Sequence, residues 1–260
     1  MMRKILVTFV LAGSCILAGA QNINGYQLPP EAIVSIVDAP QTPSVQLSPD
    51  NQTMLLLYRP GLPSIADLSQ PELRLAGLRF DPSTNGPSRG QGVIRISAMK
   101  IDGTNLGDLK GLPADVSIGG VSWSHDSKHF AFTNTTTTTI ELWVADAATM
   151  TARRIDEGIN GIFRRTMTWL PDGSIVYLRT LRNRDEAPVA SQVPAGPSVQ
   201  ESEGRQGEAP TYQDLLQDAD DERIFEYYGT SELARWDGSN SAAIGRKGLI
   251  TDVSPSPDGK

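Results

Sequence analysis

Residues 123–155 decide the fold, and they read WSHDSKHFAFTNTTTTTIELWVADAATMTARRI. Apolar, β-prone runs alternate here with turn residues, in the order strand, turn, strand, loop, strand, turn, strand. The first strand begins upstream at Val121, and the last turn spans residues 146–151. A unit of this kind is a four-stranded antiparallel meander, which is the blade of a β-propeller.

The turn near the start of this stretch recurs along the chain. It reads SHDS at residues 124–127, and related tetrapeptides are SPDN at 48–51, LPDG at 170–173 and SPDG at 256–259. The aspartate can bond to its own backbone, and glycine or asparagine tolerates a positive φ, so each turn reverses one strand into the next. A β-sandwich of unrelated hairpins would explain the strands but not this repetition. We therefore predict an all-β fold, namely an incomplete β-propeller of four-stranded antiparallel blades with a short helical insertion.

The spacing of the turns predicts two insertions. Successive turn aspartates are 76, 46 and 86 residues apart, and only the shortest interval fits a plain blade. We place the insertions at about residues 59–91 and 181–228. The first is expected to carry a short helix over residues 64–75.

The second insertion is expected to begin with a mobile surface loop over residues 185–210, which lacks the apolar residues needed for packing. Apolar residues at roughly helical spacing follow this loop. They predict two short helices that are broken near Asp220, the first of them capped by Thr211.

Composition and charge exclude several classes of protein. The 260 residues include 39% hydrophobic residues and carry a formal net charge of −7, with 30 acidic and 23 basic residues. The composition is that of a globular protein, and the charge argues against a general nucleic-acid binder. The single cysteine excludes an intramolecular disulfide framework and a cysteine-rich zinc site.

Residues 1–20 have the features of a secretory signal peptide. Two positive charges within the first four residues precede a largely apolar run at 5–17, and Ala18-Gly19-Ala20 provides the small residues of a cleavage site. The run is shorter than the about 20 residues that a transmembrane helix requires. Cys15 loosely fits a lipoprotein site, but apolar residues continue after it. We expect an exported protein, periplasmic or secreted, that is cleaved after Ala20 and has no stable membrane span.

Residues 86–90 read GPSRG and match the G-x-S-x-G nucleophile elbow of α/β-hydrolases. An elbow needs a strand before the serine and a helix after it. Here the turn-rich residues 81–85 precede Ser88, and the strand-like residues 93–101 follow it. We interpret this segment as a flexible loop without a catalytic role.

Two other groups of polar residues resemble metal sites but lack the required spacing. His125 and His129 are four residues apart in extended chain, about 13 Å, which is too far for a shared zinc ion. The acidic residues between 218 and 222 lack the glycine and the alternating ligands of a calcium loop. We predict no catalytic residue, metal site or cofactor site in this chain.

Three further segments are distinctive, namely residues 26–40 (YQLPPEAIVSIVDAP), residues 75–79 (LAGLR) and the long string from Thr211 to Leu233 that begins TYQDLLQD. They resemble segments of the prolyl oligopeptidase family of serine peptidases, and in particular of its glutamyl endopeptidase branch. The string is the most specific, because a generic propeller has no reason to contain it. The resemblance covers nearly all of the chain after Gln21.

This resemblance implies an exported serine peptidase whose propeller precedes an α/β-hydrolase domain. Residues 21–260 would be the N-terminal part of the propeller, and the Ser-Asp-His triad would lie beyond Lys260, so the chain should be inactive alone. The propeller would admit small peptides and exclude folded proteins. Its partners would be peptide substrates and its own hydrolase domain, without nucleic acid. Cleavage after glutamate would need a cationic subsite, for which the candidates by charge alone are Arg79, Arg89, Arg164 and Arg165.

The alternative is a non-enzymatic periplasmic propeller of the Tol-Pal type, which would act as a protein-binding platform. The repeated turns fit both hypotheses, whereas the string over residues 212–233 favours the peptidase. Glutamate or proline preference and the number of blades stay open. The final turn at 256–259 has no outgoing strand, so we expect a domain truncated at residue 260 that is poorly soluble or oligomeric by itself.

Overall fold

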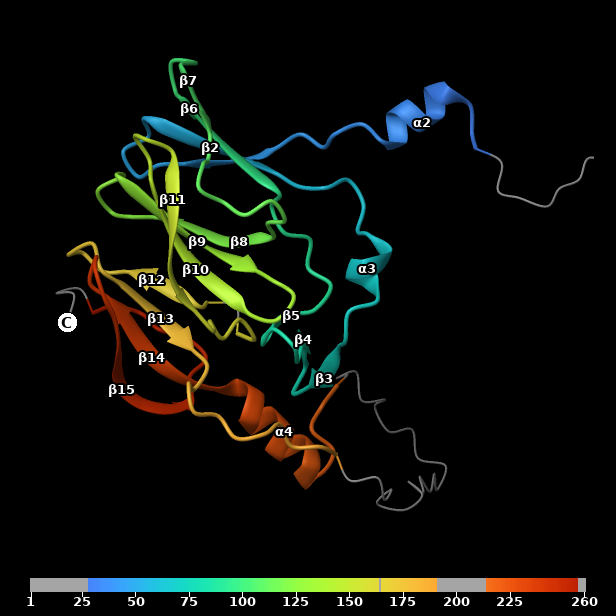
Figure 1. Ribbon diagram of the computed structural model, residues 1–260, viewed down its shortest axis with the longest axis vertical. Helices are drawn as coiled ribbons and strands as arrows, with labels where there is room; N and C mark the ends of the chain where they lie inside the picture. The colour runs from blue at the N-terminus through green and yellow to red at the C-terminus, as the bar shows by residue number, and fades with distance from the viewer. Residues whose placement is uncertain (1–27, 164, 191–213, 257–260) are drawn as a thin grey trace, which may run out of the picture. The chain divides into compact units, whose positions relative to one another are not determined.

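The computed structural model describes residues 28–163, 165–190 and 214–256. The chain divides into two compact units, Met1–Ala39 and Pro40–Lys260. The described part of the first unit contains one helix, α2 (Glu31–Val37). The described part of the second contains three four-stranded antiparallel sheets, one small three-stranded sheet and two helices (Figure 1).

The three four-stranded sheets are successive blades, and in each the strands are neighbours in the order in which the chain forms them. Blade 1 consists of β1 (Ser44–Leu47), β2 (Thr53–Tyr58), β6 (Arg95–Lys100) and β7 (Asn105–Asp108). Blade 2 consists of β8 (Ile118–Trp123), β9 (His129–Thr135), β10 (Ile140–Asp146) and β11 (Thr151–Glu157). Blade 3 consists of β12 (Met167–Trp169), β13 (Ile175–Arg179), β14 (Thr230–Trp236) and β15 (Ser241–Leu249). The predicted all-β fold of four-stranded antiparallel blades is confirmed.

The first strand of blade 2 contacts the first strands of blades 1 and 3. The Gln46 side chain of β1 donates to the carbonyl of Val121 in β8 at 3.2 Å. The Trp169 indole of β12 donates to the carbonyl of Ser122, also in β8, at 3.1 Å. The sheets therefore converge along their first strands, as blades do around the axis of a propeller.

The recurring turns join the first and second strands of each blade, and they share one geometry. Oδ1 of Asp50, Asp126 or Asp172 accepts a hydrogen bond from the backbone two residues later, at 3.0 to 3.1 Å. A serine hydroxyl donates to the same oxygen, and it holds the pKa of each aspartate below its usual value. The residue after each aspartate has a positive φ, between 58° and 80°. These contacts explain why the tetrapeptide recurs.

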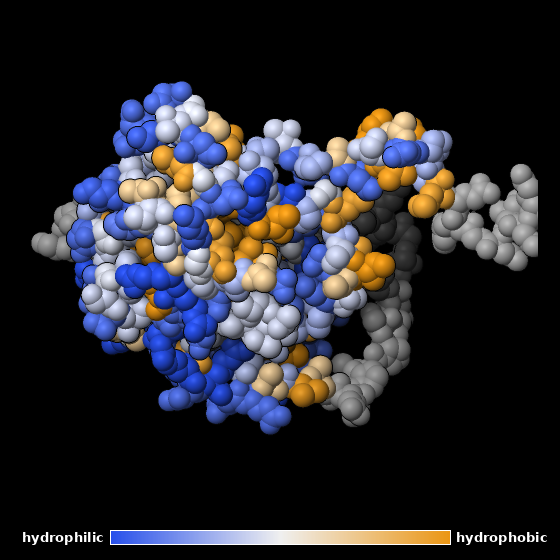
Figure 2. Space-filling model, turned by 45° about the horizontal axis from the view of Figure 1, so that its top comes forward, coloured by the Kyte–Doolittle hydropathy of each residue, from blue (hydrophilic) through white to orange (hydrophobic). Residues whose placement is uncertain are grey.

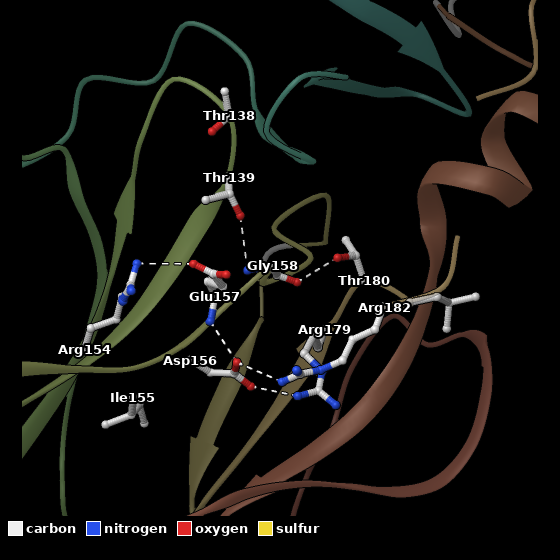
Figure 3. Close-up of a pocket in the computed structure, with 11 residues that line it drawn as sticks. Thr138, Thr139, Arg154, Ile155, Asp156, Glu157, Gly158, Arg179, Thr180 and Arg182 are labelled. Atoms are coloured by element: carbon white, nitrogen blue, oxygen red, sulfur yellow. Dashed lines mark hydrogen bonds and ion pairs between the residues drawn. The ribbon is translucent and has the colours of Figure 1, made fainter. Parts of the chain in front are cut away.

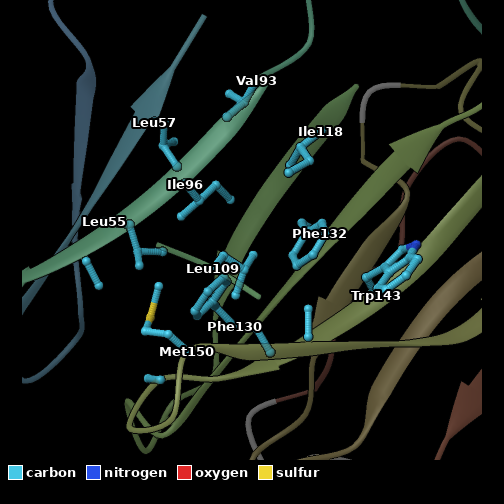
Figure 4. Close-up of a cluster of buried hydrophobic side chains, with 14 of the residues drawn as sticks. Leu55, Leu57, Val93, Ile96, Leu109, Ile118, Phe130, Phe132, Trp143 and Met150 are labelled. Carbon is cyan, nitrogen blue, oxygen red and sulfur yellow. The ribbon is translucent and has the colours of Figure 1, made fainter. Parts of the chain in front are cut away.

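Blade 2 buries both of its faces. Phe130, Phe132 and Trp143 belong to one buried cluster with Leu55 and Ile96 of blade 1, and within it the Trp143 ring stacks on Phe132 (Figure 4). The alternate residues of the same strands face blade 3 and form a second core with it. Their members in β9 and β10 are Ala131, Ile140, Leu142 and Val144. Because both faces are covered, successive residues of β9 and β10 are buried, and not only every second one.

Blade 1 leaves one apolar face partly exposed. Leu55 and Leu57 face blade 2, so alternation places Met54 and Leu56 on the opposite face. Val45 and Leu47 of β1 pair with Leu56 and Met54 and are 56% and 46% exposed. Figure 2 shows apolar residues in orange among the polar residues on the face of the molecule turned toward the viewer.

Both insertions leave the sheets at the same end, which we call the insertion end. In every blade this is the end where the second strand connects to the third, opposite the recurring turn. The connection in blade 1 carries α3 (Ile65–Leu68) and the small sheet of β3 (Leu73–Leu75), β4 (Leu78–Asp81) and β5 (Gly86–Pro87). The connection in blade 3 carries α4 (Ala219–Gly229). In blade 2 it is only a short threonine-rich hairpin tip between Thr135 and Ile140.

The helix expected over residues 64–75 is wrong beyond its first turn. Ser64 and Asp67 form a reciprocal capping box at its start. The helix ends at Leu68, because the residue before Pro71 is driven out of the helical region. Residues 73–75 form β3 instead.

The expectation of two helices broken near Asp220 is also wrong. One continuous helix, α4, begins at Ala219, and the Asp218 side chain caps it by accepting from the backbone of Asp220 and Asp221 at 2.9 Å. The acidic residues in the first turn interact favourably with the positive end of the helix dipole. The acidic residues that we expected to break a helix therefore mark the start of one. Leu215 and Leu216 precede the helix and are exposed.

Some predictions concern residues outside the described ranges. They include the signal peptide at 1–20 with Cys15, most of the loop at 185–210, the cap at Thr211 and all but the first residue of the turn at 256–259.

The recurring turn can be tested at Ser124, whose hydroxyl accepts from the His129 amide at 3.0 Å and donates to Asp126. Ser124→Ala removes this buried hydroxyl and leaves the His129 amide without its partner, so we expect a loss of about 1–3 kcal/mol in the free energy of unfolding. Urea denaturation measures this loss. Ser239→Ala, in an exposed turn of blade 3, should change stability by less than about 0.5 kcal/mol. Equal effects of the two substitutions would contradict the role of the turn.

Glu141 gives a second test, through pH. Its burial would raise the pKa, but hydrogen bonds from Asn134, Trp143 and Arg154 at 2.8 to 2.9 Å outweigh burial and lower the pKa below 4.5. A lowered pKa adds stability above about pH 4.5 that is lost as the pH falls through the folded value. Glu141→Gln should therefore be less stable than the wild type at pH 7, and the difference should shrink on acidification. Urea titrations across this range measure it; a difference independent of pH would contradict the assignment.

Candidate functional site

The insertion end holds the hollow that we consider the candidate site. This hollow, the insertion pocket, has a volume of about 550 Å³. The β3–β4 hairpin and β5 form one wall, β8 to β10 of blade 2 form the floor, and the connection from blade 2 to blade 3 closes a third side. Its lining residues are Gly77, Leu78, Arg79, Pro87, Gly119, Gly120, Thr133, Thr135, Ile140, Gly161, Ile162, Phe163 and Thr166.

The insertion pocket borders the inner edge of the blades, because Gly119 and Gly120 belong to the first strand of blade 2. Neither residue has a side chain, so the floor presents backbone there. A neighbouring hollow of about 530 Å³ lies toward blade 1 and shares Pro87, Gly119 and Thr135 with the pocket. An extended peptide backbone entering along this edge could therefore meet backbone groups and threonine hydroxyls.

Among the described residues that line the insertion pocket, Arg79 is the cationic one. It lies on β4, its side chain is 48% exposed, and its Nε donates to Oδ2 of Asp214 at 3.1 Å. The Gly77 amide donates to the backbone carbonyl of Asp214 at 2.8 Å. The residues that follow the second insertion's loop thus hold the tip of the hairpin from the first insertion. A guanidinium has five N–H donors, so Arg79 can donate to a second carboxylate in addition to Asp214.

The structure places the other candidate arginines differently. Arg89 pairs with Glu72 at 3.8 Å and does not line the insertion pocket. Arg165 pairs with Asp252 at 3.4 Å and directly precedes the lining residue Thr166. Arg164 lies outside the described residues. Of the four candidates, Arg79 alone is described as lining the pocket.

The wall of the pocket is fastened to α4 by an apolar cluster. Phe80 of β4 and Tyr228 of α4 have ring centroids 5.5 Å apart, and Ile224 and Phe163 pack with them. Leu75 and Ile162 complete the buried members. The two insertions, which are more than 100 residues apart in the sequence, therefore share one small core at the insertion end.

A third hollow, of about 710 Å³, lies between blades 2 and 3 and contains charged residues (Figure 3). Asp156 of β11 accepts from Arg179 of β13 at 2.9 Å and from the Tyr177 hydroxyl. Arg179, whose side chain is 5% exposed, also pairs with Glu232 at 2.6 Å. Burial and the Asp156 carboxylate raise the pKa of Tyr177. Because its central charges pair with one another, we interpret this network as a tie between the two blades.

Ser88, the serine of the G-x-S-x-G match, is bonded within the first insertion. Its hydroxyl donates to Oε2 of Glu72 at 2.6 Å, and this bond together with Arg74 lowers the pKa of Glu72. Gly86 and Pro87 before it form the short strand β5, whereas residues 88–89 form a turn, so the loop expected from the sequence is confined to the second part of the segment. The strand at Gly86–Pro87 is followed by the bridge at Val93 and by β6, without a helix.

The two histidines lie at the recurring-turn end of blade 2. His125 is in the turn, and Nε2 of His129 in β9 is 3.9 Å from Asp146. Within the described residues, no group of three or more His, Cys, Asp and Glu side chains is placed to hold a metal ion. No helix among these residues is long and apolar enough to cross a membrane.

Sequence reasoning missed the residues that assemble the site. Asn85 and Asn160 are 5% and 0% exposed and bond to each other and to α4. Arg184 bonds to Asn85 across 99 residues. The Asn-Gly pair at 85–86 could have indicated a tight turn with a positive φ, but nothing in the sequence indicates its distant partners.

Comparison with known proteins gives two curated relatives. The chain is 36% identical over 254 residues to a probable glutamyl endopeptidase, chloroplastic, of Oryza sativa subsp. japonica. The match covers 91% of this chain and 27% of that protein. The chain is 35% identical over 255 residues to the protein of the same name in Arabidopsis thaliana, covering 91% and 26%. The chain thus spans about a quarter of the length of these relatives. No family model matches the sequence.

Solved structures give weaker matches. An acylaminoacyl peptidase of Pyrococcus horikoshii is 15% identical with a TM-score of 0.35, covering 81% of this chain and 33% of that one. A putative TolB of Agrobacterium tumefaciens is 14% identical with a TM-score of 0.32, covering 83% and 70%. These TM-scores are too low for either structure to support a conclusion about this chain.

Proposed function

We propose that this chain is the propeller part of a serine peptidase of the prolyl oligopeptidase family, and that it corresponds to about a quarter of the length of the glutamyl endopeptidases to which it is similar. The identity over 91% of the chain to two proteins of that name carries the proposal. The Ser-Asp-His triad and the α/β-hydrolase domain lie, on this proposal, beyond residue 260. Peptide substrates and that hydrolase domain are its partners.

The propeller's part in the reaction is to select what reaches the catalytic serine. The insertion pocket is supported as the contact point by its place at the inner edge of the blades and by its backbone floor. A narrow channel through a closed propeller would admit extended peptides and exclude folded proteins. The partly exposed apolar face of blade 1 fits a closed propeller, in which another sheet would cover it.

The chemistry of cleavage would come from the hydrolase domain. A serine attacks the peptide carbonyl, a histidine transfers the proton, an aspartate orients the histidine, and backbone amides stabilise the oxyanion. The contribution of the present residues is to bind and orient the peptide before that step.

We further propose that acidic side chains are preferred, with Arg79 as the cation that recognises them. The half-exposed guanidinium lies at the wall of the pocket and is held there by Asp214. Export, with cleavage of the signal peptide after Ala20, is part of the same proposal. It rests on the sequence pattern of residues 1–20.

The peptidase function is tested with the product of the uninterrupted reading frame that contains this chain. We expect it to hydrolyse short fluorogenic peptides with glutamate before the scissile bond, to leave folded proteins intact, and to react with a serine-directed phosphonate. The 260-residue chain alone should hydrolyse nothing, with or without Ser88→Ala. Failure of the full product to hydrolyse peptides or to react with the phosphonate would favour the binding platform of the Tol-Pal type. Loss of genuine turnover on Ser88→Ala would overturn the assignment of that residue.

The acidic preference is tested by peptide binding to this chain. A blocked tripeptide with a central glutamate should bind with a lower dissociation constant than the same peptide with glutamine. Arg79→Gln should weaken binding of the glutamate peptide about tenfold or more, because a charge-assisted hydrogen bond is worth about 1.5–3 kcal/mol. Isothermal titration calorimetry measures this. Arg89→Gln is the matched control, since Arg89 has similar exposure but lies outside the pocket. Equal effects of the two substitutions would contradict the role of Arg79.

A further inference from the structure

Asn85 is the point at which the two insertions and blade 2 meet. The side chain is 5% exposed and uses its full hydrogen-bonding capacity. Its amide nitrogen donates to the Tyr228 carbonyl at 2.7 Å and to Oδ1 of Asn160 at 3.2 Å. Its oxygen accepts from both terminal nitrogens of Arg184, each at 2.9 Å. One side chain thus joins the first insertion to both ends of the second and to the connection between blades 2 and 3.

The backbone of Asn85 adds to this junction. Its carbonyl accepts from the Gly161 amide at 2.8 Å, and its φ is 59°, a conformation that asparagine tolerates better than most residues. Asn160, which is fully buried, donates to the same Tyr228 carbonyl at 2.9 Å. The end of α4 is therefore bonded to two asparagines from two different segments.

Close backbone approach fixes the distance between the first insertion and blade 2. A Cβ on Gly86 would lie 2.5 Å from Cδ1 of Ile140, and a Cβ on Gly161 would lie 2.6 Å from the same atom. The Gly161 Cβ would also lie 3.3 Å from the Cα of Gly86. The two glycines let β5 and the connection approach each other over Ile140, which lies on the floor of the insertion pocket.

Arg184 is itself held by α4. Its guanidinium lies 4.0 Å from the ring centroid of Tyr227 and 5.3 Å from that of Tyr228. The Tyr227 hydroxyl donates to the carbonyl of Asp185 at 2.8 Å. These contacts hold the start of the second insertion against its end, at α4. They also orient the planar guanidinium of Arg184 so that it donates two hydrogen bonds to Asn85.

We propose that Arg184 and Asn85 are positioning residues, through which the second insertion sets the place of the β3–β4 hairpin and hence of Arg79 at the insertion pocket. Neither residue lines the pocket, so each acts through the wall that it holds. The consequence for ligand specificity rests on the proposed function. The coupling between the insertions does not, because it is a property of the described contacts.

The test compares Arg184→Ala with Arg182→Ala. Arg182 lies two residues away, is 66% exposed and contacts Asp156, which Arg179 already pairs. Hydrogen exchange by NMR reports the Gly161 amide, bonded to Asn85, and the Gly77 amide, bonded to Asp214. We expect exchange of both amides to be about tenfold or more faster in Arg184→Ala, since the lost bonds are charge-assisted, and unchanged in Arg182→Ala. Unchanged exchange of both amides in Arg184→Ala would overturn the coupling.

Peptide binding supplies the readout that a purely structural role would not move. In Arg184→Ala the ratio of the glutamine-peptide to the glutamate-peptide dissociation constant should fall toward one, whereas Arg182→Ala should keep the wild-type ratio. Faster exchange with an unchanged ratio would overturn the role in specificity. If the wild type shows no glutamate preference, the proposed acidic preference fails, and exchange still decides the coupling.

Arg184→Lys keeps the measurement possible if Arg184→Ala does not fold. Lysine retains the charge but cannot make the two-pronged bond to one oxygen, so exchange and the affinity ratio should lie between those of the wild type and the alanine variant. A lysine variant identical to the wild type in both would overturn the assignment.

Discussion

Burial of both faces of the middle sheet is the constraint on which the rest of this structure depends. Blade 2 packs Phe130 and Phe132 against blade 1 and Leu142 and Val144 against blade 3. Apolar burial at about 25 cal/mol per Å² makes these two interfaces the main source of stability in the described blades. Since the backbone groups of each sheet are paired within it, the blades need little from one another except shape and apolar surface. This arrangement leaves the ends of the strands available for additions.

Both insertions lie at the insertion end, where they contact each other. Blade 2 has only a short hairpin at that end, so insertions from blades 1 and 3 can meet across it. They do so through a small apolar core around Phe80 and Tyr228 and through the buried bonds of Asn85. The meeting creates a pocket whose wall and floor come from different blades, with Arg79 on the wall. In a peptidase, such a pocket can select peptides without taking part in the bond-breaking step.

Local patterns predicted the blades well, because their determinants are local. The turn around Asp126 and the apolar runs beside it are specified by residues within a few positions of one another. The helices were predicted less well: Pro71 ended α3 early, and Asp218 started α4 at the point where a break was expected. The junction could not be predicted, because Asn85 meets Asn160, Arg184 and Tyr228 only after three blades have formed. Arg79 was among four arginines chosen by charge, and only packing separates it from Arg89.

The central claim is that the two insertions form one body over blade 2, and a distance measurement tests it most directly. Spin labels at Arg74→Cys on β3 and Glu226→Cys on α4, in a chain with Cys15→Ser, would report the separation of two exposed positions on the two insertions. Double electron–electron resonance should give a single narrow distribution of the distance between the two labels. A broad distribution, or one with several maxima, would show that the insertions move independently and would contradict the account.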